Sequence, residues 1–242
     1  MEGRPVEKGR CAIVEVTSDG GTIDLLPKEY NARSKVHEYG GGAATLAPDG
    51  RFVFTDANAN GIFYLSPNGE VEEIISGDPT LRYADFDVSS TEPHWILAVQ
   101  EFHREDGEVL NTIVAIDSRT KITKIVVSGA DFYSHPRFSP DGKRVAWMQW
   151  VNPDMPWTGS EVYVGDWHEA EVRNIKYIAG KAGLESVCQP RWHFDGSLLF
   201  ENDPTGFWQL YRYDFETEKV EHIHLKGYEK VDVGARQVRV GK

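Results

Sequence analysis

Short runs of β-forming residues, separated by small polar turns, dominate the hydrophobic pattern of this chain. One run, with an aromatic or β-branched centre, recurs four times, at residues 61–65, 111–117, 160–166 and 208–214. Successive runs begin 50, 49 and 48 residues apart. A fixed period of this length indicates repeated structural units rather than a single irregular sheet.

A second signal follows the same period. Asp-Gly pairs at 49–50, 141–142 and 195–196 each precede another β-rich run, at 52–54, 145–148 and 198–200. Asp and Gly tolerate the left-handed backbone angles that tight hairpins require. In the second repeat, which has no Asp-Gly pair, the polar stretch 89–92 takes the place of the turn and is followed by the run 95–99. Outer strands are predicted at 71–76, 124–128, 172–178 and 220–225.

Four antiparallel strands in every repeat predict an all-β fold, a β-propeller of about four four-stranded blades. We expect the blades at 31–78, 79–130, 131–181 and 182–227. Residues 1–30 are predicted to form the outer hairpin of an incomplete first blade, with strands at 11–16 and 22–26, and 228–242 a C-terminal tail. An open or incomplete propeller is expected, with closure by four blades as the alternative; a β-sandwich would lack the longer period.

Composition restricts the partners. The formal net charge is −12, and no run of Lys and Arg offers a surface for nucleic acid or anionic membranes. The two cysteines, Cys11 and Cys188, are expected as free thiols, which favours a cytoplasmic location, as does the lack of a signal-peptide pattern. No cofactor is predicted, and no metal site either, because His222 and His224 have no third ligand at a recognisable spacing.

The most distinctive segment runs from Arg33 to Gly42 and reads Arg-Ser-Lys-Val-His-Glu-Tyr-Gly-Gly-Gly. It resembles a signature in the propeller of prolyl-oligopeptidase-family serine peptidases, in the acylaminoacyl-peptidase and dipeptidyl-aminopeptidase-like branch. The resemblance continues in order along nearly the whole chain, most clearly at 2–5, 82–85, 111–115, 128–147, 153–157, 189–192 and 205–211.

The resemblance implies a seven-bladed propeller that caps an α/β-hydrolase domain carrying a Ser–Asp–His triad. In that family the propeller filters substrates by size and helps to hold the N-terminal end of the peptide. No Gly-x-Ser-x-Gly motif occurs in this sequence, so no serine is expected on the strand-to-helix turn that activates such a nucleophile. The chain is therefore expected to be a propeller portion that ends before the hydrolase domain and does not hydrolyse peptides itself.

The first group of candidate site residues is His37, Glu38 and Tyr39, expected to face the central channel. A histidine oriented by a carboxylate can perform acid–base chemistry. The alternative is a buried hydrogen-bond network between neighbouring blades, in which Arg33 would pair with Glu38. The glycines at 40–42 are interpreted as allowing close backbone packing rather than as a phosphate cradle.

The second group is Glu185, Gln189 and Arg191, at the entry to the last blade. They match a Glu-x-x-x-Gln-Pro stretch of the resembled family. Loops at the top face of a propeller meet ligands, and a carboxylate there can hold a peptide amine.

Three functions follow from these observations. The first is a non-catalytic propeller that binds a peptide or small molecule at the channel, or a partner, which can be a hydrolase domain or a second copy joined through open blade edges. The second is a stand-alone propeller recruited as a lyase, isomerase or cyclase. The third is a general interaction scaffold, because fold alone does not determine function.

Overall fold

The structure is a computed structural model that describes residues 1–227 and 232. The described residues form strands and loops, with one 3-10 turn, η1 (Pro5–Glu7). No helix among them is long and apolar enough to cross a membrane. The chain divides into two compact units, unit 1 (Met1–Val126) and unit 2 (Val127–Lys242). The predicted tail, 228–242, lies outside the described residues except for Asp232.

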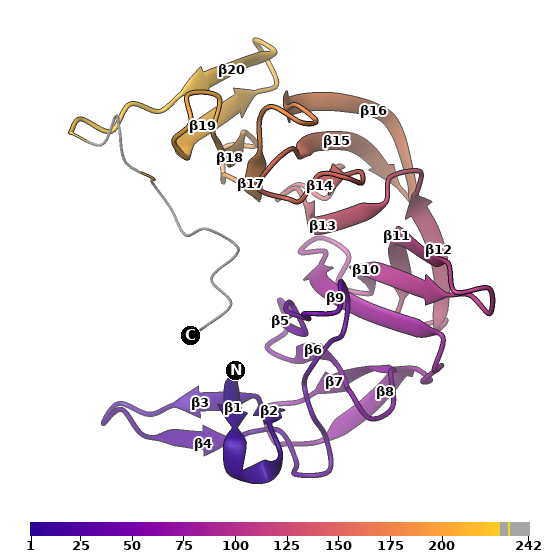
Figure 1. Ribbon diagram of the computed structural model, residues 1–242. Coiled ribbons are helices and arrows are strands. Elements are labelled where there is room, and N and C mark those ends of the chain that lie inside the picture. Colours follow the sequence, from indigo (N-terminus) through magenta and orange to yellow (C-terminus); the bar gives the residue numbers. More distant parts are fainter. Residues whose placement is uncertain (228–231, 233–242) are drawn as a thin grey trace. The chain divides into compact units, whose positions relative to one another are not determined.

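Unit 1 contains two four-stranded antiparallel blades (Figure 1). The strands of the first blade pair in chain order, β5 (Ala44–Leu46), β6 (Phe52–Thr55), β7 (Ile62–Leu65) and β8 (Val71–Ile75). Those of the second do the same, β9 (Leu81–Val88), β10 (Trp95–His103), β11 (Val109–Asp117) and β12 (Ile122–Val127). The third strands, β7 and β11, coincide with the first two predicted repeats.

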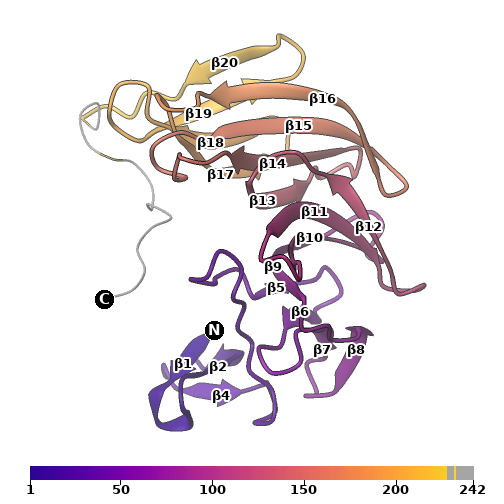
Figure 2. The same ribbon diagram turned by 45° about the vertical axis from the view of Figure 1, so that its right-hand side comes forward.

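Unit 2 repeats this arrangement. Its first blade is β13 (Phe132–Phe138), β14 (Arg144–Trp150), β15 (Glu161–His168) and β16 (Glu171–Gly180). Its second is β17 (Val187–Trp192), β18 (Leu198–Asn202), β19 (Gln209–Asp214) and β20 (Lys219–His222). Figure 2 shows the two sheets of this unit lying against each other. The predicted fold class is confirmed: four blades of four strands are present, and none of the described sheets closes on itself.

The blades are held face to face by apolar side chains that alternate along the strands. In unit 1, Val53 and Ile62 of one blade pack against Ile96 and Val114 of the other, all with no exposed surface. In unit 2, Phe200 packs in the cluster that includes Met148 and Val162. Burial of such faces is the main stabilising contribution to a stacked-sheet fold.

The N-terminal residues differ in detail from the predicted hairpin. The hairpin is present as β3 (Val14–Val16) and β4 (Thr22–Asp24), but β2 (Arg10–Ala12) pairs instead with β1 (Glu2–Arg4), which was not predicted. The two pairs separate at Ile13, whose carbonyl accepts hydrogen bonds from the backbone N–H groups of Leu25 (2.9 Å) and Leu26 (3.3 Å).

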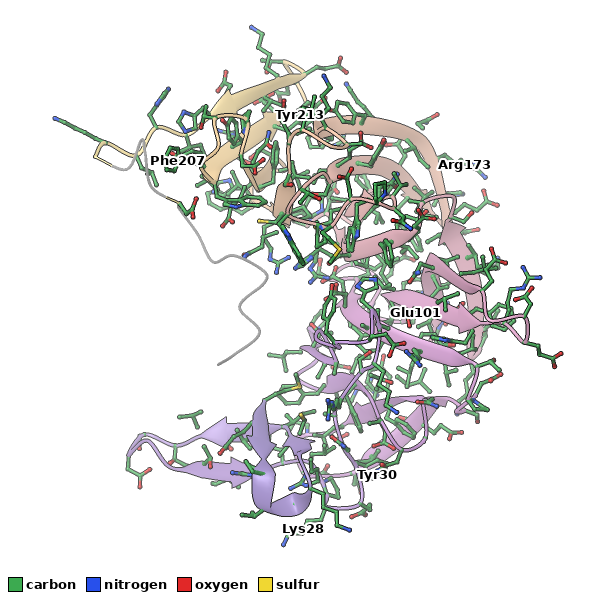
Figure 3. All side chains as sticks on the ribbon, in the orientation of Figure 1. Lys28, Tyr30, Glu101, Arg173, Phe207 and Tyr213 are labelled. Carbon is green, nitrogen blue, oxygen red and sulfur yellow. The ribbon has the colours of Figure 1, made fainter. Side chains whose placement is uncertain are left out.

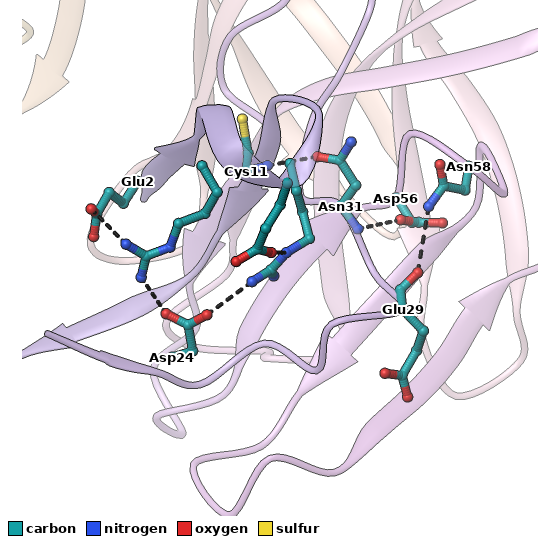
Figure 4. A network of polar contacts seen from close by, with 10 residues as sticks. Glu2, Cys11, Asp24, Glu29, Asn31, Asp56 and Asn58 are labelled. Carbon is teal, nitrogen blue, oxygen red and sulfur yellow. Dashed lines mark hydrogen bonds and ion pairs between the residues drawn. The ribbon is translucent and has the colours of Figure 1, made fainter.

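A polar network ties these strands together and to the first blade (Figure 4). The Asp24 carboxylate bridges Arg4 and the Arg10 guanidinium, with Arg10 Nη2 at 2.8 Å. These two arginines hold the pKa of Asp24 below its usual range. Asn31 then accepts a hydrogen bond from the Cys11 N–H (2.8 Å) and donates its own N–H to Asp56 (2.7 Å).

A bulge recurs in the first strand of three blades. In β9, β13 and β17, two residues of the strand lie opposite one residue of its neighbour. The first of the two has a positive φ each time, at Asp85 (55°), His135 (53°) and Gln189 (51°). A left-handed non-glycine residue is uncommon and re-aims the side chain away from the strand's regular alternation.

Candidate functional site

The distinctive segment of unit 1 folds as a tight turn followed by glycines that precede β5. His37 and Glu38 both have positive φ, 55° and 65°, and so do Gly40, Gly41 and Gly42. A Cβ on Gly42 would lie 2.2 Å from Asp85 Oδ1, so only glycine allows this approach to β9. The N–H of Asp85 donates to the Gly42 carbonyl at 2.8 Å, which joins the turn to the second blade.

Glu101, near the end of β10, is the buried charge around which this turn is organised (Figure 3). Only 4% of its side chain is exposed. Its carboxylate accepts the backbone N–H of His37 (2.5 Å) and lies 3.0 Å from His103 Nε2. Arg82 Nη1 is 3.6 Å from the same carboxylate. Buried charges require such partners because an uncompensated one costs several kcal/mol.

Arg82, and not Arg33, is the partner of Glu38. Arg82 Nη1 lies 2.7 Å from Glu38 Oε1 and also donates to the Lys35 carbonyl at 3.1 Å. The side chain of Glu38 is 79% exposed, and Arg82 lowers its pKa. Arg33 is exposed. The expected Arg33–Glu38 pair is therefore replaced by a bond to the second blade, for which the local sequence holds no information.

His37 and Tyr39 are the two members of this group whose side chains are placed for acid–base chemistry. The Tyr39 hydroxyl lies 3.3 Å from His37 Nδ1, and the two rings are 5.7 Å apart. Burial lowers the pKa of His37, although the Glu101 and Asp85 carboxylates oppose that shift. Burial and the same two carboxylates raise the pKa of Tyr39. At neutral pH this pair is therefore a neutral imidazole beside a protonated phenol.

Glu185 lies in the loop between β16 and β17 of unit 2 and is half-buried. Its carbonyl accepts the N–H groups of Ser160 (3.2 Å) and Lys181 (3.1 Å), so its backbone is fixed. Burial raises the pKa of Tyr211, and the Glu185 and Asp203 carboxylates raise it further. This end of the sheet therefore carries a negative field.

Gln189 and Pro190 form the bulge of β17, and Arg191 follows it in regular register opposite Leu199. The Arg191 Nη1 donates to the Pro190 carbonyl at 3.1 Å, and Arg137 makes the same bond to Pro136 in β13 at 2.7 Å. The sequence predicted a group of three binding residues here. The structure places Gln189 and Arg191 in the strand and Glu185 in the loop before it.

Three residues of the unit 1 network, Arg82, Glu101 and His103, were not among the predicted site residues. Arg82 lies in a segment that carries the family resemblance, whereas Glu101 is signalled only as an acid at the end of an otherwise apolar strand. Among residues 1–227 and 232, no group of three or more His, Cys, Asp or Glu side chains is placed to hold a metal ion.

Comparisons with known proteins support the family resemblance. No family model matches the chain, and no curated protein matches it. A solved puromycin-hydrolyzing peptidase from Mycobacterium tuberculosis is similar, with 27% identity and a TM-score of 0.80. The match covers 92% of this chain and 36% of that chain. A puromycin hydrolase gives 27% identity and a TM-score of 0.79, over 91% of this chain and 36% of that one.

The chain thus corresponds to about a third of the length of these peptidases and is similar to their propeller portion. An oligogalacturonate lyase in complex with manganese is also similar, with a TM-score of 0.66 over 89% of this chain and 59% of that chain. Its identity is 14%, so this second likeness concerns the fold alone.

Proposed function

We propose that this chain acts as the propeller portion of a prolyl-oligopeptidase-like peptidase, and that its part is to bind a peptide or a protein partner rather than to cleave bonds. The observation that carries the proposal is the match of 92% of the chain to only 36% of a peptidase chain. The absence of a Gly-x-Ser-x-Gly motif from the sequence supports the non-catalytic part.

The polar groups of unit 1 also support binding over catalysis. Glu101 accepts from His37, lies beside Arg82 and hydrogen-bonds to His103, so its carboxylate already has structural partners. Glu38 is likewise engaged by Arg82. Groups committed to joining two blades rigidify the loops between them, and rigid loops bind ligands with a smaller entropic loss.

The test combines a reactive probe with a binding measurement. The purified chain is treated with a fluorophosphonate, with an intact serine peptidase as the positive control, and is titrated with a mixed set of short peptides. We expect no covalent labelling and saturable peptide binding. Labelling at a serine together with amide cleavage would contradict the non-catalytic role, and a lack of any peptide or protein binding would contradict the binding role.

A second candidate, a stand-alone enzyme of the lyase, isomerase or cyclase type, is favoured by one observation. The Tyr39 hydroxyl and His37 Nδ1 lie 3.3 Å apart, a geometry that suits proton transfer, and Tyr39 is 59% exposed. Metabolite profiles of cells carrying wild-type protein and Tyr39→Phe test this candidate. A difference between the profiles supports it, and identical profiles remove Tyr39 from consideration.

A further inference from the structure

One end of unit 2 presents a group of exposed apolar side chains, which we call the loop patch. Its members are Val151 (42% exposed), Met155 (41%), Trp157 (42%) and Leu184 (70%). The first three belong to the loop between β14 and β15, and Leu184 belongs to the loop between β16 and β17. Both loops lie at the same end of the blade, because Glu161 at the start of β15 pairs with Gly180 at the end of β16.

The two loops are fixed to each other by hydrogen bonds. The Gly183 N–H donates to Asp154 Oδ2 at 2.8 Å and the Ser160 N–H donates to the Glu185 carbonyl at 3.2 Å, and within the first loop the Met155 N–H donates to Thr158 Oγ1 at 2.8 Å. A Cβ on Gly159 would lie 2.3 Å from Gly183 N, which shows how closely the two backbones approach. The loop patch is therefore preorganised, and a partner need not order these loops in order to bind them.

Carboxylates lie at the same ends of the strands in both blades of unit 2. Lys181 is the one basic residue within 151–159 and 181–185. Burial and then the carboxylates of Glu161 and Glu185 raise the pKa of Tyr177. The acidic residues at this end of the unit include Asp131, Asp154, Glu161, Glu185 and Asp203, and Lys226 follows β20 at the same end. An apolar centre with a charged rim is the usual anatomy of a protein recognition surface, and Trp and Met are enriched there.

We propose that the loop patch binds a basic peptide segment, with a large apolar side chain against Trp157 and Leu184 and Lys or Arg side chains on the acidic rim. The proposal rests on the peptide-binding role given above and names its site and ligand class. Charge complementarity selects the partner. Because the carboxylates are spread over the loops of two blades, several positive charges match them better than a single terminal amine.

Fluorescence anisotropy with a labelled peptide tests the proposal. The probe is acetylated and amidated Gly-Arg-Phe-Lys-Gly, which has no free amine at its N-terminus. Its two comparison peptides replace Arg and Lys by Glu, or Phe by Ser. We expect binding of the probe only, with an affinity that falls as NaCl is added, since salt screens exposed charges.

Protein variants locate the site. Trp157→Ala and Leu184→Ser together are expected to weaken binding by about tenfold, as loss of a central apolar anchor does. Glu185→Gln is expected to weaken it by about threefold, because the half-buried carboxylate remains partly screened by solvent. Phe194→Ala and Glu216→Gln are the matched controls, since Phe194 and Glu216 lie in turns at the other end of the same strands and should leave binding unchanged.

Each outcome decides something. Equal binding by wild type and the Trp157, Leu184 double variant would place the site elsewhere and leave the peptide-binding function intact. A further peptide has a free N-terminus and neutral residues in place of Arg and Lys. If it binds more strongly than the probe, the ligand is a terminal amine and not a basic segment. Failure of all short peptides to bind would contradict this proposal and the peptide-binding form of the proposed function, and would leave its protein-partner form standing. Thermal melts of each variant check that folding is retained.

Discussion

Units 1 and 2 have the same strand order and the same bulge in a first strand, yet they join their two blades with different chemistry. In unit 1 a buried carboxylate, Glu101, connects the turn at His37 to β10 and lies beside Arg82. In unit 2 the buried bonds of the junction are neutral: Ser160 Oγ donates to the Val187 carbonyl at 2.8 Å and accepts the Val187 N–H at 3.0 Å. The ion pair between the same two blades, Lys176–Glu218 at 2.8 Å, is solvent-exposed. The repeated sheet therefore determines where the blades meet but not which bonds join them.

The difference has a physical reason. The turn of unit 1 holds two non-glycine residues, His37 and Glu38, in left-handed conformations, each of which costs free energy. An ion network with several partners compensates for that cost and holds the turn in one geometry. In unit 2 the comparable pair of left-handed residues, Glu169 and Ala170, forms the tight turn between β15 and β16 within one blade, so that pair places no strain at the junction between the blades. The comparison predicts that substitutions at the charged junction have larger effects than those at the neutral one.

The largest effect is expected for Glu101→Ala. This substitution leaves Arg82, His103 and the His37 N–H without their shared carboxylate, and we expect a loss of about 3 kcal/mol in the free energy of unfolding. Urea denaturation followed by tryptophan fluorescence measures it. Glu38→Gln is the control, because Glu38 is exposed and its removal should leave the urea midpoint nearly unchanged. Equal losses in the two variants would show that the charged junction does not depend on the buried group.

Gly42→Ala comes next, with an expected loss of about 2 kcal/mol from left-handed strain and from the clash with Asp85. Gly50→Ala is the matched control, since Gly50 also has a positive φ, 86°, but an added Cβ meets nothing within 4 Å. The difference between the two urea midpoints isolates the close approach to β9. No difference would mean that β9 moves aside at little cost.

Ser160→Ala tests the neutral junction of unit 2. Ser160 has no exposed surface, and its hydroxyl satisfies both polar groups of Val187. Leaving a buried N–H unpaired is expected to cost about 1.5 kcal/mol. Hydrogen exchange at Val187 supplies a local readout beside the urea midpoint. A loss as large as that of Glu101→Ala would invalidate the distinction between the two junctions.

The smallest effect concerns pH. Burial raises the pKa of Glu201, and the Asp232 carboxylate adds to the shift, although the bond from Cys188 Sγ at 3.1 Å opposes it. A carboxyl group whose pKa is raised on folding stabilises the fold at low pH, and that stability is lost as the pH rises through the folded-state pKa.

Glu201→Gln removes this titration. The stability of the variant relative to wild type should therefore rise between about pH 4 and about pH 7. Urea midpoints at the two pH values measure this change, with Glu216→Gln as an exposed control. A constant difference between variant and wild type would contradict the assignment.

The strands were predictable from the sequence because their signals are local. The β-forming runs of β7, β11, β15 and β19 and the Asp-Gly turns repeat with nearly constant spacing. The partners at the site were not predictable in the same way. Glu38 lies 44 residues before its partner Arg82, and His37 lies 64 residues before Glu101, so no local pattern signals these bonds. The short spacing of Arg33 to Glu38 suggested a bond that the turn geometry does not make.

The pairing of β1 and the left-handed residues were also missed, for a related reason. β1 is three residues long and lies at a chain end, so it carries too little periodicity to be detected. Asp85, His135 and Gln189 share a backbone conformation but no side-chain type. Because the bulge imposes this conformation on different side chains, the sequence carries no consistent signal for it.

That bulge has a consequence for how such repeats diversify. Where two residues already lie opposite one, the local ladder of hydrogen bonds is interrupted whatever side chain is present. Exchanging an acid, an imidazole or an amide at this position therefore alters what a repeat displays with little penalty to strand registration. Each of the three blades with this bulge thus offers natural selection, or a protein engineer, one place in which new chemistry can be tried while the architecture stays intact.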